Sequence, residues 1–371
     1  MASLDQICTL NMGQSPDSAS YNENGEGIPF FQGNADFGII HPKVRVWCNA
    51  PTKIAHEGDI LISVRAPIGA LNIADRECCI GRGLAALAVN EALCDKDYLW
   101  YAIASKVDEL NSKGTGSTFK AIGKNVLAET EIPLLDLTEQ EKIAGSLKKV
   151  DELITLRKEQ LRKLDQLVKS RFIELFGDPV YNNNGLPAKK LCELGSLDRG
   201  RSQHRPRNDP KLLNGPYPLI QTGEVASAGL YITEYKNTYS ELGLQQSKMW
   251  KAGTLCITIA ANIAQTAILT FDACFPDSVV GFVPNDAVSA IYMHYWFGFF
   301  QKILEEQAPQ VAQKNINLKI LSDLDVMVPT KEQQEQFAAF VEQTDKSKLA
   351  IQQSLDKLEL LKKSLMQEYF G

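Results

Sequence analysis

The densest run of side chains able to bind another molecule is the decapeptide RGRSQHRPRN, residues 199–208. Guanidinium groups bind phosphates, and Arg, Gln and Asn side chains also bind base edges. We therefore predict that this loop contacts nucleic acid; the alternative is an ordinary solvated loop. The candidate residues are Arg199, Arg201, Gln203, His204, Arg205 and Arg207.

Four further groups of polar residues are candidates for the same contact. Gln14 and Ser15 lie in an acidic loop that corresponds in position to the basic one. Two groups flank expected strands and turns: Gln32, Asn34, Gln221 and Thr222 at strand ends, and Arg65 and Arg82 beside turns, where internal ion pairs are the alternative. The last group belongs to two polar connectors: Lys113, Lys120, Gln313, Lys314 and Asn315.

Signatures of catalysis are missing from the sequence. It contains no GxxxxGK[ST] phosphate loop, and the glycine-rich GTGST (residues 114–118) lacks the lysine. NGPYP (residues 214–218) only superficially resembles the tetrapeptide of amino-methyltransferases, and both segments are expected to be turns. The eight cysteines form no CxxC pair and the four histidines are scattered, so we predict reduced thiols, no metal site, no cofactor and no active site.

The elements that position these loops are organised by a duplication. Residues 138–177 and 332–371 superimpose without a gap after a shift of 194 residues. Gln140 falls on Gln334, Asp151 on Asp345, and Phe176 on Phe370. A single repeat this long indicates duplication, because solenoid units are about 20–50 residues long.

Each copy of the repeat predicts one long coiled-coil helix. Apolar residues recur at steps of three and four, interrupted by Arg157 and Arg171 in the first copy and by Lys348 and Lys362 in the second. Because these polar positions do not coincide, we expect the two helices to pair with each other. The first should end near Gly177, ahead of a proline.

The remaining sequence predicts two α+β domains. In the first we expect strands at 28–32, 59–64, 70–73, 84–89 and 131–135, and a helix at 96–112. Residues 191–202 resemble 4–15, so the second domain should repeat this plan. The predicted segments are 1–137 (domain 1), 138–178 (helix 1), 179–329 (domain 2) and 330–371 (helix 2).

Composition limits the class of protein. A chain of 371 residues with 44% hydrophobic residues suits two globular domains. The net charge of −6 argues against indiscriminate coating of nucleic acid. No apolar run approaches the roughly 20 residues of a membrane helix, so we expect a cytoplasmic location.

Taken together, these motifs resemble the specificity subunits of type I restriction-modification systems. The resemblance rests on the helix lead-ins IPLLDLTEQEKIA and VMVPTKEQQEQFA, the helix endings LFGDP and YFG, and the domain openings LNMGQSP and LDRGRSQ. The stretch SVRAPIGALNIADRECCIGRGLAAL (residues 63–87) is similar to one recurrent type of target-recognition domain.

This resemblance implies two target-recognition domains, each reading one half of a split DNA sequence, joined by two long helices in an antiparallel coiled coil. It implies double-stranded DNA and two modification subunits as partners, with two restriction subunits where these exist. S-adenosylmethionine, ATP and Mg²⁺ would belong to the partner subunits. The open alternatives are a modification-only methyltransferase subunit, a coiled-coil adaptor that does not read DNA, and an enzyme with no recognisable motif.

Overall fold

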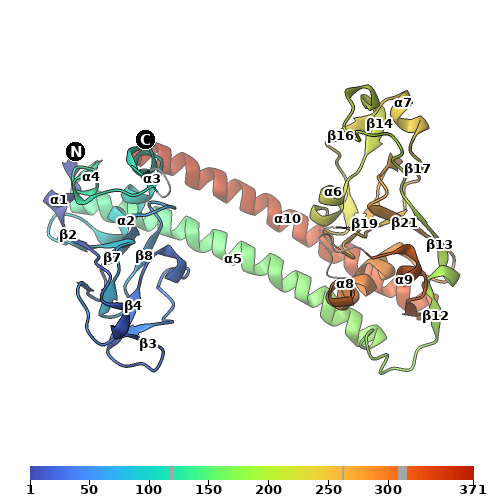
Figure 1. The fold of residues 1–371 in the computed structure, drawn as a ribbon, viewed down its shortest axis with the longest axis horizontal. Coiled ribbons are helices and arrows are strands. Elements are labelled where there is room, and N and C mark those ends of the chain that lie inside the picture. Colours follow the sequence, from blue (N-terminus) through green and yellow to red (C-terminus); the bar gives the residue numbers. More distant parts are fainter. Residues whose placement is uncertain (117–119, 261–262, 308–315) are drawn as a thin grey trace. The chain divides into compact units, whose positions relative to one another are not determined.

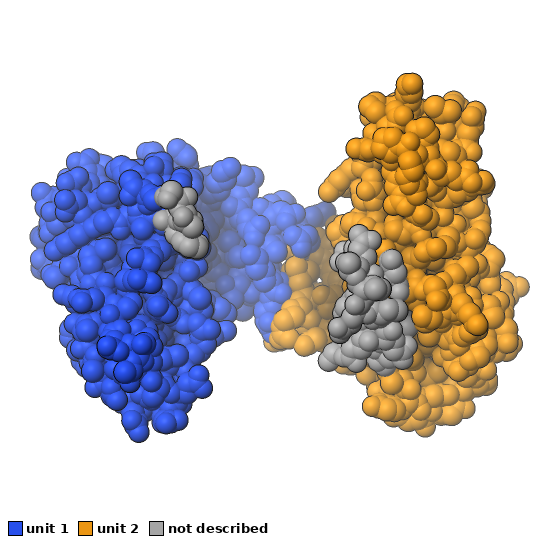
Figure 2. Space-filling model, viewed as in Figure 1, with its two compact units in different colours: residues 1–159, 352–371 blue, residues 160–351 orange. Residues whose placement is uncertain are grey.

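The computed structural model describes residues 1–116, 120–260, 263–307 and 316–371. The chain divides into two compact units. Unit 1 contains residues 1–159 and 352–371, and unit 2 contains residues 160–351 (Figure 2). Each unit is therefore a globular part completed by segments of two long helices.

The two long helices are α5 (Leu137–Phe176) and α10 (Lys331–Phe370) (Figure 1). In unit 1, Lys362 Nζ lies 2.6 Å from Asp151 Oδ1, and Lys158 Nζ lies 3.0 Å from Glu359 Oε1. From the first pair to the second, the residue number increases in α5 and decreases in α10, so the two helices are antiparallel. The predicted antiparallel coiled coil is confirmed.

Lys348 and Lys362, the polar positions in the seam of the second helix, form ion pairs with the first helix. In unit 2, Lys348 Nζ lies 2.7 Å from Asp165 Oδ1, as Lys362 pairs with Asp151 in unit 1. Both acids are on α5 and both lysines are on α10. Opposite charges at these positions favour pairing of the two different helices over pairing of like helices.

The described residues of unit 1 form three sheets and four short α-helices besides the segments of α5 and α10. The pair β1 (Ala2–Ser3) and β11 (Glu131–Ile132) joins the start of the chain to the approach to α5. The four-stranded sheet has the order β2 (Cys8–Met12), β10 (Leu84–Val89), β7 (Ile60–Ser63), β8 (Leu71–Ile73). The five-stranded sheet has the order β3 (Tyr21–Asn22), β5 (Trp47–Cys48), β4 (Ile28–Phe31), β9 (Cys78–Ile80), β6 (Ile54–Ala55). The helices are α1 (Leu4–Ile7), α2 (Lys96–Ser105), α3 (Val107–Lys113) and α4 (Lys124–Ala128).

Unit 2 repeats this plan. The pair is β12 (Ala188–Lys190) and β22 (Asp325–Met327). One sheet has the order β13 (Gly195–Arg199), β21 (Val279–Pro284), β18 (Leu255–Thr258), β19 (Thr266–Leu269), β15 (Tyr231–Ile232). The other has the order β16 (Asn237–Tyr239), β14 (Leu213–Leu219), β20 (Ala273–Cys274), β17 (Met249–Trp250). The helices are α6 (Thr222–Ser227), α7 (Glu241–Gln245), α8 (Ala290–Gln307) and α9 (Leu318–Ser322).

Several expected elements differ in extent. The expected helix 96–112 is two helices, because Lys106 leaves helical geometry at φ −94° and ψ 4°. The strand expected at 131–135 covers only Glu131–Ile132. In unit 1, strands β1, β2, β3, β5, β6 and β9 were not predicted; all but β2 have only two or three residues, too few to display an alternating pattern.

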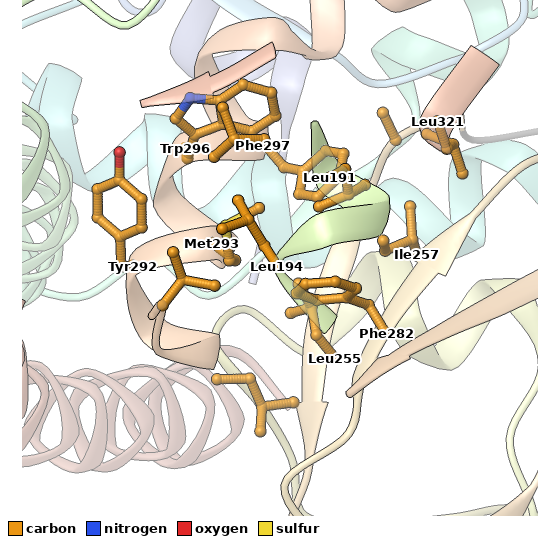
Figure 3. Packing of buried hydrophobic residues seen from close by; sticks show 14 of the residues in the cluster. Leu191, Leu194, Leu255, Ile257, Phe282, Tyr292, Met293, Trp296, Phe297 and Leu321 are labelled. Atoms are coloured by element: carbon orange, nitrogen blue, oxygen red, sulfur yellow. The ribbon is translucent and has the colours of Figure 1, made fainter. Parts of the chain in front are cut away.

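The main core of unit 2 forms where α8 packs on the sheet (Figure 3). Tyr292 and Trp296 of α8 belong to the same buried cluster as Leu255 of β18 and Phe282 of β21. Phe176, the last residue of α5, joins this cluster and lies 5.1 Å from the Tyr292 ring. Phe370 lies 5.2 Å from Tyr98 in unit 1, which accounts for the aromatic residue that ends both repeats.

Buried polar side chains explain two other repeated residues. Gln140 Nε2 donates to the carbonyls of Leu93 (3.1 Å) and Leu135 (2.7 Å), and its Oε1 accepts from Asp95 N (2.9 Å). Gln334 makes the same three bonds in unit 2, to Ala287 O, Pro329 O and Ser289 N. Each glutamine ties the start of a long helix to the globular part of its unit.

The cysteines are free thiols, and all but Cys192 are buried. Burial raises the pKa of the Cys8, Cys78 and Cys94 thiols to about 12. A thiol with such a pKa is scarcely ionised at neutral pH and is a poor nucleophile. These cysteines therefore contribute packing, as the sequence predicted.

Candidate nucleic-acid interface

In unit 1 the first loop is fixed by the strands that it crosses. Gly13 N donates to Leu84 O (2.9 Å), and Gln14 N donates to Ile80 O (3.0 Å). A Cβ atom on Gly13 would lie 2.2 Å from Gly81 O, so only glycine fits this close approach. The backbone thereby holds Gln14 and Ser15 beside the turn between β9 and β10.

Four of the predicted residues of unit 1 line one cavity of about 380 Å³: Gln32, Asn34, Arg65 and Arg82. Tyr21 and Phe30, stacked with ring centroids 4.7 Å apart, also line it. Ser15 is adjacent, because its Oγ accepts from Arg82 N at 3.3 Å. The structure thus brings together side chains from the first loop, a strand end and two turns.

Arg65 and Arg82 are exposed, and neither forms an ion pair within the part of the chain that the structure describes. The internal ion pairs weighed as the alternative are therefore not formed there. Among the described residues, neither guanidinium group donates a side-chain hydrogen bond, so these donors are available for an outside acceptor. Unpaired arginines beside Gln32 and Asn34 have the chemistry that base edges and phosphates require.

The two lysines of the first connector behave differently. Lys120 lies beside Arg65, because Lys120 O accepts from Ala66 N at 3.0 Å and Arg65 bridges to the next residue, Ala121. Lys113 ends α3, and its Nζ pairs with Glu109 at 2.7 Å. Lys120 therefore adds positive charge beside Arg65, whereas the charge of Lys113 is balanced locally.

Unit 2 uses the same backbone frame. Gly200 N donates to Val279 O (2.8 Å) and Arg201 N to Phe275 O (3.1 Å), as Gly13 and Gln14 do in unit 1. A Cβ atom on Gly200 would lie 2.3 Å from Phe275 O, which explains why glycine recurs. Arg201 thus occupies the position of Gln14.

A second pair of hydrogen bonds aligns the turns. Ile259 N donates to Ser278 O (3.0 Å) where Val64 N donates to Gly83 O (2.9 Å). Ala260 therefore corresponds to Arg65, and Asp277 corresponds to Arg82. In unit 1 the arginines therefore lie in the turns, whereas in unit 2 they lie in the first loop.

The basic loop of unit 2 is held by three contacts. Gln246 Oε1 accepts from the backbone of Gln203 (2.7 Å) and His204 (3.1 Å). His204 Nε2 lies 3.1 Å from Asp209, whose pKa is lowered by the Lys211 N–H and by His204. Arg207 pairs with Asp277 at 2.6 Å.

Arg205 is the second arginine near Asp277, at 3.9 Å, and its guanidinium also donates to Ser202 O at 2.7 Å. Arg199 and Arg201 are exposed, and no carboxylate among residues 120–260, 263–307 and 316–371 pairs with either. The loop therefore contains two restrained arginines and two unpaired ones.

The other predicted residues of unit 2 are only partly described. Gln221 and Thr222 follow β14, and Ile220 N donates to Cys274 O (2.9 Å), next to the carbonyl that anchors Arg201. Gln221 N in turn donates to Glu224 at 3.2 Å. Gln313, Lys314 and Asn315 lie outside the described residues. Ile316, which follows them, donates to Ile259 O at 3.0 Å, as Ile122 donates to Val64 O in unit 1.

Two residues of this surface were not predicted. Arg45 lines the cavity of unit 1 and pairs with Asp36, which also accepts from Gln32 N at 2.7 Å. The alternation Lys43, Val44, Arg45 was an available signal, because it places both cations on one face of an extended segment. No comparable pattern identified Asp277, because its ion-pair partner Arg207 is 70 residues away in the sequence.

Among the residues that the structure describes, no group of three or more His, Cys, Asp or Glu side chains is placed to hold a metal ion. Within the same ranges, no helix has the length and hydropathy needed to cross a membrane.

Comparison with protein families gives a match to most of the chain. A family model described as the type I restriction modification DNA specificity domain matches residues 1–166 and 188–361. Each matched segment covers one globular part and most of the long helix that follows it.

Individual relatives carry related names. The chain is 44% identical over 158 residues to a putative type I restriction enzyme MjaX specificity subunit of Methanocaldococcus jannaschii, covering 43% of this chain and 37% of that protein. It is 28% identical over 214 residues to the MjaIX specificity subunit of the same organism, covering 53% and 48%. These two matches span less than half of either relative. The EcoBI specificity subunit of Escherichia coli is 20% identical over 392 residues, covering 92% of this chain and 78% of that one.

Solved structures share the fold. The S subunit of a type I restriction-modification system from M. genitalium superimposes with a TM-score of 0.61 at 16% identity, covering 100% of this chain and 95% of that one. A chain from a structural study of type I R-M complex assembly and conformational transition gives a TM-score of 0.62 at 17% identity, covering 100% and 96%. At these identities the likeness shows the fold alone.

Proposed function

The chain belongs to the type I restriction-modification DNA specificity family, and from this premise we propose that it is the DNA-reading subunit of a type I restriction-modification complex. Each unit would read one half of a bipartite target. The long helices would set the spacing between the halves and provide a scaffold for the modification subunits.

The observation that carries the proposal is one backbone frame presenting two different sets of side chains. Gln14 and Arg82 in unit 1 stand where Arg201 and Asp277 stand in unit 2. Duplicated domains with one shared task are expected to keep their functional residues. Here the supporting hydrogen bonds are kept while the exposed residues differ, which suits two readers of different sequences.

The exposed groups match the acceptors and donors of the DNA major groove. Arginine binds the O6 and N7 atoms of guanine, and Gln or Asn binds the N6 and N7 atoms of adenine. In unit 1 these roles would fall to Arg65, Arg82, Gln32 and Asn34. In unit 2 they would fall to Arg199, Arg201 and Gln221, with the other predicted polar residues positioning the protein on phosphates.

The chain itself would catalyse nothing. Modification subunits would methylate adenine with S-adenosylmethionine, and restriction subunits, where present, would hydrolyse ATP with Mg²⁺ and cut. A modification-only complex would use this chain in the same way. The cellular location would be the cytoplasm, where the chromosome is found in a prokaryotic cell.

Methylome sequencing tests the proposal. The chain would be co-expressed with its modification subunits in a host that lacks adenine methylation. We expect one split motif whose two halves respond separately: Arg82→Ala should relax one half and Arg201→Ala the other. Methylation of a contiguous motif, or a motif unaffected by both variants, would overturn the assignment.

An adaptor that joins proteins without reading DNA is the alternative, favoured by the excess of acidic over basic residues in 1–137. The assembled methyltransferase would be titrated with duplex DNA at several salt concentrations. Steep loss of affinity with salt is expected only where phosphates are contacted. Salt-independent binding, or none, would favour the adaptor.

A further inference from the structure

We propose that Asp277 is a positioning residue that restrains Arg205 and Arg207, so that unit 2 discriminates between sequences instead of binding DNA through charge alone. This inference rests on the proposed function. It concerns a residue that presents no donor to DNA and acts on the arginines that do.

The contacts of Asp277 place it between two cations of the basic loop. Arg207 Nη2 lies 2.6 Å from Asp277 Oδ1 and 2.9 Å from Oδ2, so both oxygens engage the same guanidinium nitrogen. Arg205 Nη2 lies 3.9 Å from Asp277 Oδ2. One carboxylate thus faces two arginines from a turn distant in sequence.

The backbone of Asp277 is fixed, so the carboxylate is a stationary partner for a longer loop. Val279 N donates to Pro276 O at 3.0 Å, and the neighbouring Ser278 O accepts from Ile259 N at 3.0 Å. The basic loop, residues 199–208, is held on its other side by Gln246, whose Oε1 accepts from Gln203 N and His204 N. The ion pair therefore limits where the two guanidinium groups can go.

Unit 1 shows the same position without this restraint. Arg82 occupies the place of Asp277, Gln14 occupies the place of Arg201, and residues 14–20 of the first loop contain no arginine. At this position a carboxylate, Asp277, is found in unit 2, whose first loop is rich in arginine. Asp277 therefore partly neutralises the positive charge of Arg205 and Arg207.

The physical consequence is a smaller phosphate contribution to binding. A negative charge beside two arginines repels phosphates and competes with them for the same donors. Freed arginines would neutralise additional phosphates, and each such contact steepens the salt dependence of log K by about 0.9 for B-DNA. Between about 50 and 200 mM salt, one extra contact corresponds to a further loss of about 3.5-fold in affinity.

The experiment uses the assembled methyltransferase complex and two duplexes of equal length. One carries the motif found by methylome sequencing, and the other is a defined sequence without it. For Asp277→Asn we expect tighter binding to the motif-free duplex at low salt, by about threefold to tenfold, and a salt slope steeper by about 1 to 2. The ratio of the two affinities should fall by a similar factor.

Three variants show whether the effect runs through the arginines. Asp272→Asn is the matched control, because Asp272 pairs with Lys251 at 2.7 Å at the opposite end of the β18–β19 hairpin; it should change neither slope nor ratio. Asp277→Glu should behave as the wild type, because it keeps the carboxylate. Adding Arg207→Gln to Asp277→Asn should remove most of the added slope.

The outcomes separate this inference from the proposed function. If the wild-type complex shows no salt-dependent DNA binding, the DNA-reading assignment itself fails. If the wild type binds its motif but Asp277→Asn leaves slope and ratio unchanged, only the role of Asp277 is wrong. An equal change in Asp272→Asn would also overturn it, by showing a general effect of net charge.

Discussion

At the scale of single residues, pairing decides which cations are available for a ligand. Arg82 lines the unit 1 cavity and is not paired with any carboxylate in the described part of that unit. Arg76 carries the same formal charge, but its Nη2 lies 2.9 Å from Asp75 Oδ2. The two residues lie six positions apart in sequence and should differ sharply in their effect on DNA binding.

We expect Arg82→Ala to weaken binding of the complex to its target motif by about tenfold and to relax the base preference of one half-site. Arg76→Ala serves as the control and should leave both the affinity and the base preference unchanged. Binding would be measured by fluorescence anisotropy at several salt concentrations. Equal effects of the two variants would show that location in the cavity does not matter.

The buried amide of Gln140 is a residue on which stability depends. Replacement by Ala leaves two carbonyls and one N–H of unit 1 without their partner, at a cost of about 1–3 kcal/mol for each group that stays buried and unsatisfied. We expect Gln140→Ala to destabilise unit 1 by about 2–4 kcal/mol in total. Gln353, exposed on α10, is the control and should tolerate Ala.

Hydrogen exchange can locate the Gln140 effect. Protection should fall at Asp95 and at the start of α5, while the corresponding segment around Ser289 in unit 2 stays protected by Gln334. Uniform loss of protection over both units would contradict a local role for this amide. The paired design is possible because the chain contains both copies.

At the scale of elements, α8 and β19 are joined through a histidine. His294 Nδ1 lies 3.0 Å from Thr266 Oγ1, and burial, together with Lys348, lowers the pKa of His294 to about 4. The ordinary pKa of histidine is about 6.5 in an unfolded chain. The unfolded state therefore binds a proton at a higher pH than the folded state does.

It follows that unit 2 should lose stability as pH falls from about 6.5 toward 4, by at most about 3 kcal/mol from this group. Above pH 6.5 the group is neutral in both states and contributes no pH dependence. His294→Gln should flatten the stability profile in this window, whereas exposed His56→Gln should not. Thermal denaturation at several pH values would check the prediction, and parallel profiles for both variants would contradict it.

At the scale of the whole molecule, two ion pairs can be kept while the long helices are shortened. Deleting residues 155–161 from α5 and 352–358 from α10 removes one heptad from each helix and leaves Asp151, Asp165, Lys348 and Lys362 in place. Seven residues of helix are about 10 Å long, close to the rise of 3 base pairs of B-DNA.

If the helices act as a spacer, the double deletion should keep both half-sites and shorten the gap between them by about 3 base pairs. Deleting 155–161 alone should abolish methylation, because the ion pairs and apolar seams then lose their common register. Methylome sequencing reads both results. An unchanged motif in the double deletion would rule out the spacer role.

The features that repeat along the chain were predictable from the order of its amino acids. The shift of 194 residues, the apolar seams and the polar positions at Lys348 and Lys362 predicted two long helices that pair with each other. Such patterns can be recognised in the sequence because the spacing of apolar residues recurs many times along a helix of 40 residues. Arginine-rich composition likewise identified the basic loop, since charge density is a local property.

Which polar side chains lie together, and which charges are neutralised by a partner distant in sequence, became evident from the folded chain alone. Gln32, Arg65 and Arg82 line one cavity because a strand end and two turns lie side by side in the folded chain. No local sequence pattern indicates that these three segments are neighbours. Arg207 carries the same formal charge as Arg82, yet Asp277, 70 residues away in the sequence, pairs with it. Ion pairing depends on distances of a few ångströms between segments far apart in the chain, which composition and periodicity do not specify.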